Sequence, residues 1–290
     1  MDTLERPPSR IAPAPARHLA EGTIHSGAPL GRMGPLEVRL ARNAAEIAAA
    51  QEVRYRVFSA EMGARFASGG GSRDADHYDT FCDHLVVSDT ELDGPEHRRI
   101  VGTYRLLRQE AAGASGGFYT SGEFELDALL ARNPGRRFLE LGRSCVLPAY
   151  RTRRTVELLW QGIWAYARGH GIDVMTGCAS FPGTVPAAHA EPLSFLAHHF
   201  AAEGAWATRA LPDRYHTMDL MPVEAIDRKA AVLALPPLIK GYLRLGARFG
   251  DGCVVDRDFG TTDVLVILPV EAISARYINH YGADAGRFAA

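Results

Sequence analysis

One carboxylate and one guanidinium stand close together in a largely apolar stretch near the middle of the chain. Residues 138–147 read FLELGRSCVL, and Glu140 and Arg143 are the two charged members. The apolar residues around them predict a strand. A carboxylate can act as a general base and a guanidinium can bind an anion. These two residues are therefore the first candidates for chemistry.

A turn rich in arginine follows this strand and contains Arg151, Arg153 and Arg154. Thr152 or Thr155 can cap the helix that starts there, because threonine is a favoured N-cap residue. Apolar residues then recur three and four positions apart as far as Gly169. Backbone N–H groups and the positive end of the helix dipole point toward the turn, which suits it to an anion. From charge alone, a solvated basic turn is an equally good interpretation.

The elements that would position these residues follow the order of an α/β protein with one mixed sheet. Before the central stretch we expect a strand at 36–41, a helix at 43–58, and hairpin strands at 84–90 and 99–108. Residues 110–122, rich in Gly and Ser, predict a loop, and a short helix follows at 125–132. After it we expect a strand at 173–180, a helix at 192–200 and a strand at 263–268. Strand, helix and strand from 138 to 180 predict a right-handed crossover between parallel strands.

The composition is that of an ordinary globular protein. The chain has 290 residues, 47% of them hydrophobic, and a formal net charge of -2. This charge argues against nucleic-acid binding through global charge, and no apolar run reaches the roughly 18 residues of a membrane span. The four cysteines are far apart, which favours free thiols in a reducing, cytoplasmic compartment. We expect no metal site, because His198 and His199, adjacent on a helix, point in different directions.

We expect one domain preceded by a tail. Residues 1–35 contain six prolines and no apolar segment of the kind found in secretory signals, which predicts a disordered N-terminal tail. Residues 36–290 then form a single domain, with a C-terminal extension from about residue 221. Within the extension, residues 235–245 could lie on a membrane surface, although packing in the core is the stronger interpretation.

The central segment resembles the GCN5-related N-acetyltransferase superfamily, whose acyl donor binds at a strand, turn and helix of this kind. The usual motif there is Arg or Gln, two residues, Gly, one residue, and Gly or Ala, with backbone amides around the coenzyme A pyrophosphate. Arg151 matches the first position, but Arg154 and Val156 replace the small residues. The resemblance implies a mixed β-sheet flanked by helices. The larger residues at these two positions favour the 4'-phosphopantetheine arm of an acyl carrier protein as donor. The single phosphate of that arm needs a less closely fitting loop than a pyrophosphate does.

Segments spread over residues 54 to 270 resemble the ornithine N-alpha-acyltransferase family, also called hemolysin-like. They are RYRVFSAEMGA, DHYDTFCDHLVV, VGTYRLL, ELGRSCV, GCASFPGT, PPLIKGYLRLGA and FGTTDVLVILPV. The resemblance implies transfer of a 3-hydroxy fatty acyl group from acyl carrier protein to the α-amine of L-ornithine. The product would be lyso-ornithine lipid, and the reaction would be the first step of ornithine lipid biosynthesis. The enzyme would hold no permanently bound cofactor.

This resemblance implies roles for individual residues. Glu140 would take the proton of the attacking amine, with Arg143 beside it. The residues implied for the amino acid substrate are Arg56, Asp79, Asp83 and Arg105. Those implied for the acyl donor are Val146, Arg151, Arg153, Arg154 and Thr155. The docking face for the acidic carrier protein would consist of Arg136, Arg137, Arg151, Arg153 and Arg154. For the charged residues, an ion-pair network that only orders the site is the alternative.

Two other functions fit parts of the pattern. Acyl-homoserine lactone synthases resemble the chain at Arg56, Phe58, Asp76, Asp79, Arg105 and the spacing of Glu140 and Arg143. They lack the segment PPLIKGYLRLGA, and they would consume S-adenosylmethionine in place of ornithine. A non-enzymatic lipid-binding protein of the same fold would transfer an acyl group to no amino acid. For the acyltransferase we expect a cytoplasmic location, with a peripheral contact at the inner membrane face for product release.

Overall fold

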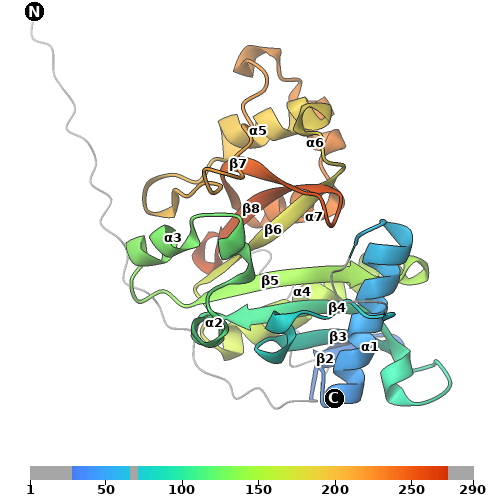
Figure 1. Cartoon of the computed structure of the whole chain (residues 1–290). Helices are drawn as coiled ribbons and strands as arrows, with labels where there is room; N and C mark the ends of the chain where they lie inside the picture. Colours follow the sequence, from blue (N-terminus) through green and yellow to red (C-terminus); the bar gives the residue numbers. More distant parts are fainter. Residues whose placement is uncertain (1–27, 66–70, 274–290) are drawn as a thin grey trace, which may run out of the picture.

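Eight strands form one mixed sheet in the order β1-β2-β3-β4-β5-β6-β8-β7 (Figure 1). The computed structural model describes residues 28–65 and 71–273. All neighbouring strands are antiparallel except β5 and β6, which are parallel. The strands are β1 (Pro29–Met33), β2 (Leu36–Leu40), β3 (Asp83–Asp89), β4 (Ile100–Arg108), β5 (Phe138–Val146), β6 (Val174–Pro182), β7 (Arg248–Asp256) and β8 (Thr261–Pro269). The predicted mixed sheet and its parallel crossover are confirmed.

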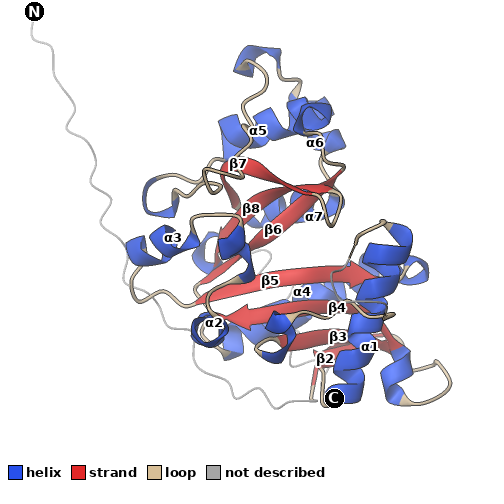
Figure 2. Ribbon diagram, viewed as in Figure 1, coloured by secondary structure: helices blue, strands red, loops and turns tan. Residues whose placement is uncertain are grey.

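Helices cover both faces of this sheet (Figure 2). They are α1 (Ala44–Tyr55), α2 (Gln109–Ser115), α3 (Leu126–Arg132), α4 (Arg153–Gly169), α5 (Ala190–Phe200), α6 (Arg228–Ala234) and α7 (Pro237–Leu245). Helix α1 packs with Val86 of β3, whereas Gly162 of α4 lies against the side chain of Leu85. Neighbouring strand residues point to opposite faces. Helices α1 and α4 therefore cover opposite faces of the sheet.

Helices α1 and α4 begin at side-chain caps that the sequence predicts. At α1 the N–H of Glu46 donates to Asn43 Oδ1 over 3.1 Å. At α4 the N–H of Thr155 donates to Thr152 Oγ1 over 3.3 Å. Each cap satisfies an N–H group that the first helical turn leaves without an intrahelical partner. Of the two threonines that could cap α4, Thr152 is therefore the N-cap.

Strands β5 and β6 pair over three residues and then separate. The pairs run from Phe138 with Val174 to Glu140 with Thr176. Beyond them β5 stays paired with β4, while β6 stays paired with β8 along its whole length. Gly177 lies where the strands part, with φ 146, and a Cβ there would lie 2.3 Å from the carbonyl oxygen of Leu141. The sheet thus opens between the carboxyl-terminal parts of two parallel strands, near the edge at which open α/β sheets bind ligands.

A β-bulge lies at Arg143 on β5. Thr103 of β4 pairs with Cys145, whereas Arg105 pairs with Gly142, so β5 carries one more residue than β4 over this interval. Arg143 has φ 51, a left-handed conformation that costs a non-glycine residue roughly 1–2 kcal/mol. Bulges redirect side chains, and strain of this kind persists where surrounding contacts hold it. The backbone of β5 therefore sets the direction of the Arg143 side chain.

Three segments differ from the sequence prediction. The predicted tail of residues 1–35 extends too far, because Pro29–Met33 forms the edge strand β1. Proline is tolerated at the first residue of an edge strand, and residues 1–27 lie outside the described part. The predicted loop at 110–122 is wrong, since it contains most of α2 and the 3-10 helix Tyr119–Gly122. Strand β7 was not expected. With β8 it completes the sheet, so much of the chain after residue 221 shares the main core.

Replacing Gly177 by alanine should lower the free energy of unfolding by about 2–5 kcal/mol. The added methyl group would meet the Leu141 carbonyl, and the backbone conformation disfavours any L side chain. Urea denaturation measures the change. The control is Gly113→Ala in α2, where nothing lies within 4 Å of an added Cβ. It should be neutral or stabilising by up to about 1 kcal/mol. Equal losses at both glycines would contradict the role of Gly177.

Candidate active site

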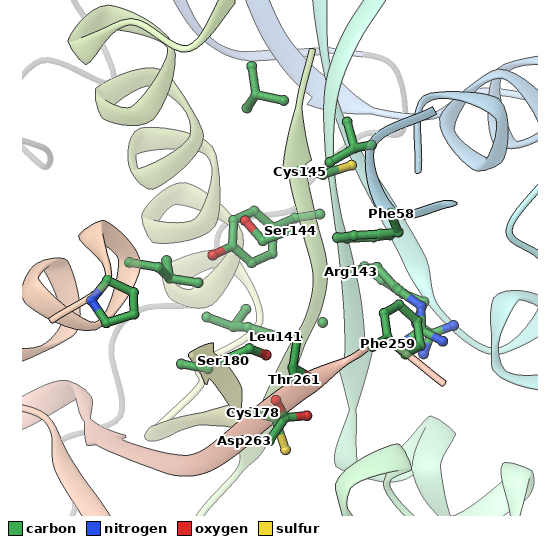
Figure 3. Close-up of a pocket in the computed structure, with 18 of the residues that line it drawn as sticks. Phe58, Leu141, Arg143, Ser144, Cys145, Cys178, Ser180, Phe259, Thr261 and Asp263 are labelled. Carbon is green, nitrogen blue, oxygen red and sulfur yellow. The ribbon is translucent and has the colours of Figure 1, made fainter. Parts of the chain in front are cut away.

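A cavity of about 500 Å³ lies where β5 and β6 part. Figure 3 shows Arg143, Phe58 and Phe259 to one side of β5, with Thr261, Cys178 and Asp263 grouped together in the lower part of the view. Apolar lining residues include Tyr104, Leu141, Val156, Leu159, Trp160 and Leu238. Polar lining residues include Arg105, Thr120, Glu140, Arg143, Cys178, Ser180 and Asp263. The lining is therefore divided into an apolar part and a polar part.

The two parts of the lining come from opposite faces of the sheet. Tyr104, Leu141 and Leu159 belong to the core cluster that packs around α4 and α7. Glu140 and Asp263 lie two residues from Phe138 and Leu265, which belong to the cluster on the other face. Residues two apart on a strand share a face. The cavity thus runs through the sheet, so two substrates can approach one point from opposite sides.

The carboxylate of Glu140 is fixed by the segment that follows α2. Its Oε1 accepts the backbone N–H of Thr120 over 2.8 Å and also the Thr120 hydroxyl. Its Oε2 accepts the N–H of Tyr119 over 2.9 Å. A carboxylate has about four acceptor positions. Among the described residues three are used, so one position on Oε2 remains for a substrate proton.

Burial raises the pKa of Glu140, and the hydrogen bonds from Thr120 and Tyr119 oppose that rise. The side chain is 4% exposed and lines the cavity. Burial disfavours the charged carboxylate, whereas donors that hold the charged form favour it. The resulting raised pKa moves Glu140 toward neutral pH, which suits a general base.

A network of three arginines and three aspartates lies beside Glu140 and consists of Arg54, Arg105, Arg143, Asp74, Asp76 and Asp79. Arg54 is fully buried and contacts Asp74 over 2.9 Å and Asp79 over 2.7 Å. Burial alone would raise the pKa of Asp79, but its bonds to Arg54 more than offset this and lower it. Asp79 is therefore an ionised structural group.

Arg143 joins this network to the cavity. Its guanidinium lies 3.1 Å from Asp74 and 3.2 Å from Asp76. It also stacks on the rings of Tyr119 and Phe259, at 4.8 and 4.5 Å from their centroids. Burial acts to lower the pKa of Arg143, but the neighbouring Tyr119 and Asp74 raise it overall. Arg143 is thus a permanent, firmly oriented positive charge on the polar side of the cavity.

The residues predicted for the amino acid substrate are only partly brought together. Arg105 lines the cavity and contacts Asp76 over 2.6 Å. Asp79 lies behind it, bound to Arg54. Asp83 accepts the hydroxyl of Tyr166 on α4 instead. Neither aspartate is among the cavity-lining residues.

Arg56 is exposed and lines a separate surface depression. The buried arginine of α1 is Arg54, because it falls four residues after Ala50 and three before Val57 on the inner face. The helical period could have identified Arg54 in place of Arg56.

The predicted donor residues cluster at the start of α4. Val146 and Arg151 line the cavity, and Arg151 pairs with Glu61 over 2.5 Å. Arg153 and Arg154 point outward, and the Arg153 side chain is 89% exposed. Thr155 is buried against its cap, Thr152. The cavity therefore opens beside the arginine-rich turn.

A second buried acidic group at the cavity was not predicted. Glu123, Cys178 and Asp263 each offer one ligand atom within 4.8 Å of the others. The expectation of no metal site considered histidines, and this group contains none. The Cys178 thiol donates to Glu123 over 3.1 Å, and burial raises its pKa well above the usual range. A metal ion bound here would have to displace that proton.

Comparisons with known proteins show the family of the chain. A model of the acetyltransferase (GNAT) domain matches residues 53–161. The L-ornithine N(alpha)-acyltransferase of Rhizobium meliloti (strain 1021) is 63% identical over 89% of this chain and 88% of that protein. The L-ornithine N(alpha)-acyltransferase of Brucella abortus (strain 2308) is 61% identical over 89% of this chain and 93% of its own length. The chain belongs to the L-ornithine N(alpha)-acyltransferase family.

The family assignment confirms the resemblance noted from the sequence and identifies the chain as an acyltransferase. Among solved structures, an N-acyl amino acid synthase from uncultured soil microbes, FeeM, matches with a TM-score of 0.49 and 12% identity, over 81% of this chain and 91% of that chain. Within the described residues, no helix combines the length and apolar character needed to cross a membrane.

Replacing Arg54 by methionine should lower the free energy of unfolding by about 3–5 kcal/mol, because Asp74 and Asp79 would both lose the buried guanidinium that lies nearest to them. The matched control on the same helix is Arg56→Met. This arginine is exposed, so the change should stay within about 0.5 kcal/mol. Chemical denaturation of both variants provides the comparison. A larger loss at Arg56 than at Arg54 would mean that the network is wrongly described.

Proposed function

We propose that the protein transfers a 3-hydroxy fatty acyl group from acyl carrier protein to the α-amine of L-ornithine, giving lyso-ornithine lipid. The observation that carries the proposal is the 61–63% identity to L-ornithine N(alpha)-acyltransferases over most of both chains. The cavity supports it, because the buried carboxylate of Glu140 lines it.

In the proposed reaction, Glu140 takes a proton from the α-amine, directly or through water. The amine nitrogen then attacks the thioester carbon, so a C–N bond forms and the C–S bond breaks. The leaving thiolate takes the remaining extra proton of the attacking nitrogen and departs as a thiol, and Glu140 releases the first proton to solvent. The free acceptor position on Glu140 and its raised pKa both support this role. Backbone N–H groups of residues 143–146, next to the bulge, would stabilise the oxyanion.

Acyl carrier protein is the proposed donor because the start of α4 is poorly suited to a pyrophosphate. The N–H of Thr155 already donates to Thr152, so it is not available to a phosphate. Arg154 and Val156 add side chains where close-fitting loops have small residues. A phosphopantetheine arm carries one phosphate and could pass these side chains, while Arg153 and Arg154 attract the acidic carrier protein.

The lipid product supports a proposed peripheral contact with the inner face of the membrane from a cytoplasmic location. Helix α7 is unsuited to that contact, since Ile239 and Tyr242 are buried in the core. The neighbouring helix α6 exposes Val232 by 43% and Leu233 by 80%. Its Arg228 and Lys229 are also exposed and would face anionic lipid.

The function is tested by incubating the purified protein with 3-hydroxyacyl carrier protein and a panel of amino acids, with the product identified by mass. We expect an amide of L-ornithine. Consumption of S-adenosylmethionine in place of ornithine would indicate a lactone synthase. Comparable turnover with 3-hydroxyacyl coenzyme A would contradict the assignment of the donor, because the arginine-rich turn should hinder the pyrophosphate.

Replacing Glu140 by glutamine should lower turnover of ornithine by about 10²- to 10⁴-fold, because the amine would have no base. Steady-state kinetics measure the loss. Circular dichroism and thermal unfolding check that the variant is folded.

A second variant, Thr120→Val, separates the base from a structural role. It removes the hydroxyl that stabilises the Glu140 carboxylate, so the pKa of Glu140 should rise further. The base acts when deprotonated, so the acidic limb of the kcat/KM profile should move to higher pH. A profile that stays in place would show that Glu140 is not the base.

A further inference from the structure

We propose that Asp263, with Glu123 behind it, binds the side-chain ammonium of the acceptor and so selects a diamino acid. This inference rests on the proposed function, because it concerns which amine substrate occupies the same cavity. It places the acidic subsite on β8 and at Glu123, which follows the 3-10 helix Tyr119–Gly122, away from the aspartates of the ion-pair network.

Asp263 has a buried oxygen that is available for a ligand. The residue is 6% exposed, yet its side chain lines the cavity. Among the described residues, Asp263 Oδ1 has no hydrogen-bond partner. A buried carboxylate oxygen without a donor is costly, and a bound ammonium would supply both a donor and the opposite charge.

Glu123 adds a second carboxylate beside Asp263. The Glu123 side chain accepts the Cys178 thiol over 3.1 Å, and Arg214 lies 3.4 Å from its other oxygen. Burial raises the pKa of Glu123 to about 7 and that of Asp263 to about 6, and the charge of Asp263 adds to the rise at Glu123. Hydrogen bonds from Ser180 and Thr261 to Asp263, and the charge of Arg214, oppose these rises without cancelling them, so the protein compensates the local negative charge only in part. A substrate cation would compensate it.

The side chain of Thr120 lies between the proposed base, Glu140, and the acidic subsite. Thr120 donates to Glu140 and lies 3.8 Å from the sulfur of Cys178. That sulfur is within 4.8 Å of Asp263. In extended ornithine the two nitrogens are roughly 6 Å apart, given bond lengths of about 1.5 Å. One molecule can therefore present its α-amine to Glu140 and its terminal ammonium to Asp263.

The other end of the substrate has a complementary partner. Arg143 and Arg105 carry positive charge on the same polar side of the cavity, and both stack against Tyr119. A carboxylate next to the α-amine would face these arginines. The cavity therefore offers positive groups for the carboxylate and negative groups for the ammonium of one diamino acid.

The experiment compares L-ornithine with L-norvaline, which has the same carbon chain without the terminal amine. In wild-type protein kcat/KM should favour ornithine strongly. Asp263→Asn should lower kcat/KM for ornithine by about 10- to 100-fold, mostly through KM, and leave norvaline within about threefold. Glu123→Gln should act in the same direction and serves if the first variant fails to fold. The control is Asp258→Asn, an exposed carboxylate on the β7–β8 turn.

Each outcome separates the two proposals. If wild-type protein acylates neither amino acid, the proposed function is wrong. If it acylates ornithine and both variants keep the full preference for ornithine, the subsite is wrong. Equal loss for ornithine and norvaline would assign Asp263 and Glu123 to folding or chemistry instead. Loss of ornithine turnover on chelation with EDTA, restored by Zn²⁺, would mean that the group binds a metal.

Discussion

The shared ion pairs of Asp74 hold the active site together. This carboxylate contacts Arg54 of α1 and Arg143 of the β5 bulge at 2.9 and 3.1 Å. Helix, loop and strand are thereby fixed to one another at a buried point. Buried ion pairs contribute little net stability compared with apolar packing, but breaking one is costly. The main effect of the network is therefore to fix the positions of these elements, and its net contribution to stability is small. Its contacts also hold Arg143 in its strained backbone conformation.

The open sheet turns this rigid framework into a reaction site. Pairing between β5 and β6 ends after Glu140, so this carboxylate, the base that we propose, stands at the edge of the opening. Apolar side chains reach the opening from the α4 face, and charged ones reach it from the α1 face. An acyl chain and an amino acid differ most in polarity. Because the acyl chain and the amino acid would reach the opening from opposite faces of the sheet, each can lose its water against a surface of matching polarity. The two substrates still meet at one point.

The sequence predicted most of the fold because strands and helices leave local patterns. The alternation in residues 138–147 and the helical period after Thr152 were sufficient to identify β5, α4 and their crossover. The edge strand β1 and the strand β7 were missed. Strand β1 begins at Pro29 and is followed closely by Pro35, and prolines weaken the pattern that predicts a strand. Strand β7 contains Gly250 and Gly252, which weaken the pattern in the same way.

The site was predicted less completely, because it depends on contacts between distant segments. Glu140 and Arg143, which line the cavity, were selected from their place in an apolar strand. Thr120 was not, since a segment rich in Gly and Ser gives no sign that its backbone will bind a carboxylate 20 residues away. Asp263 was also missed as a site residue, because it reads as the first polar residue of a strand. Its place beside Cys178 follows from the pairing of β6 with β8.

That pairing has a consequence for how the enzyme is made. Strand β6 shares three residue pairs with β5 but is paired along its full length with β8, whose residues begin 79 positions after Pro182. Until Thr261–Pro269 leaves the ribosome, β6 exposes most of its backbone. Closing such long-range contacts is slow and leaves strand edges open to wrong partners. The nascent chain therefore gains its protected sheet edge and its complete reaction cavity in the same late folding event.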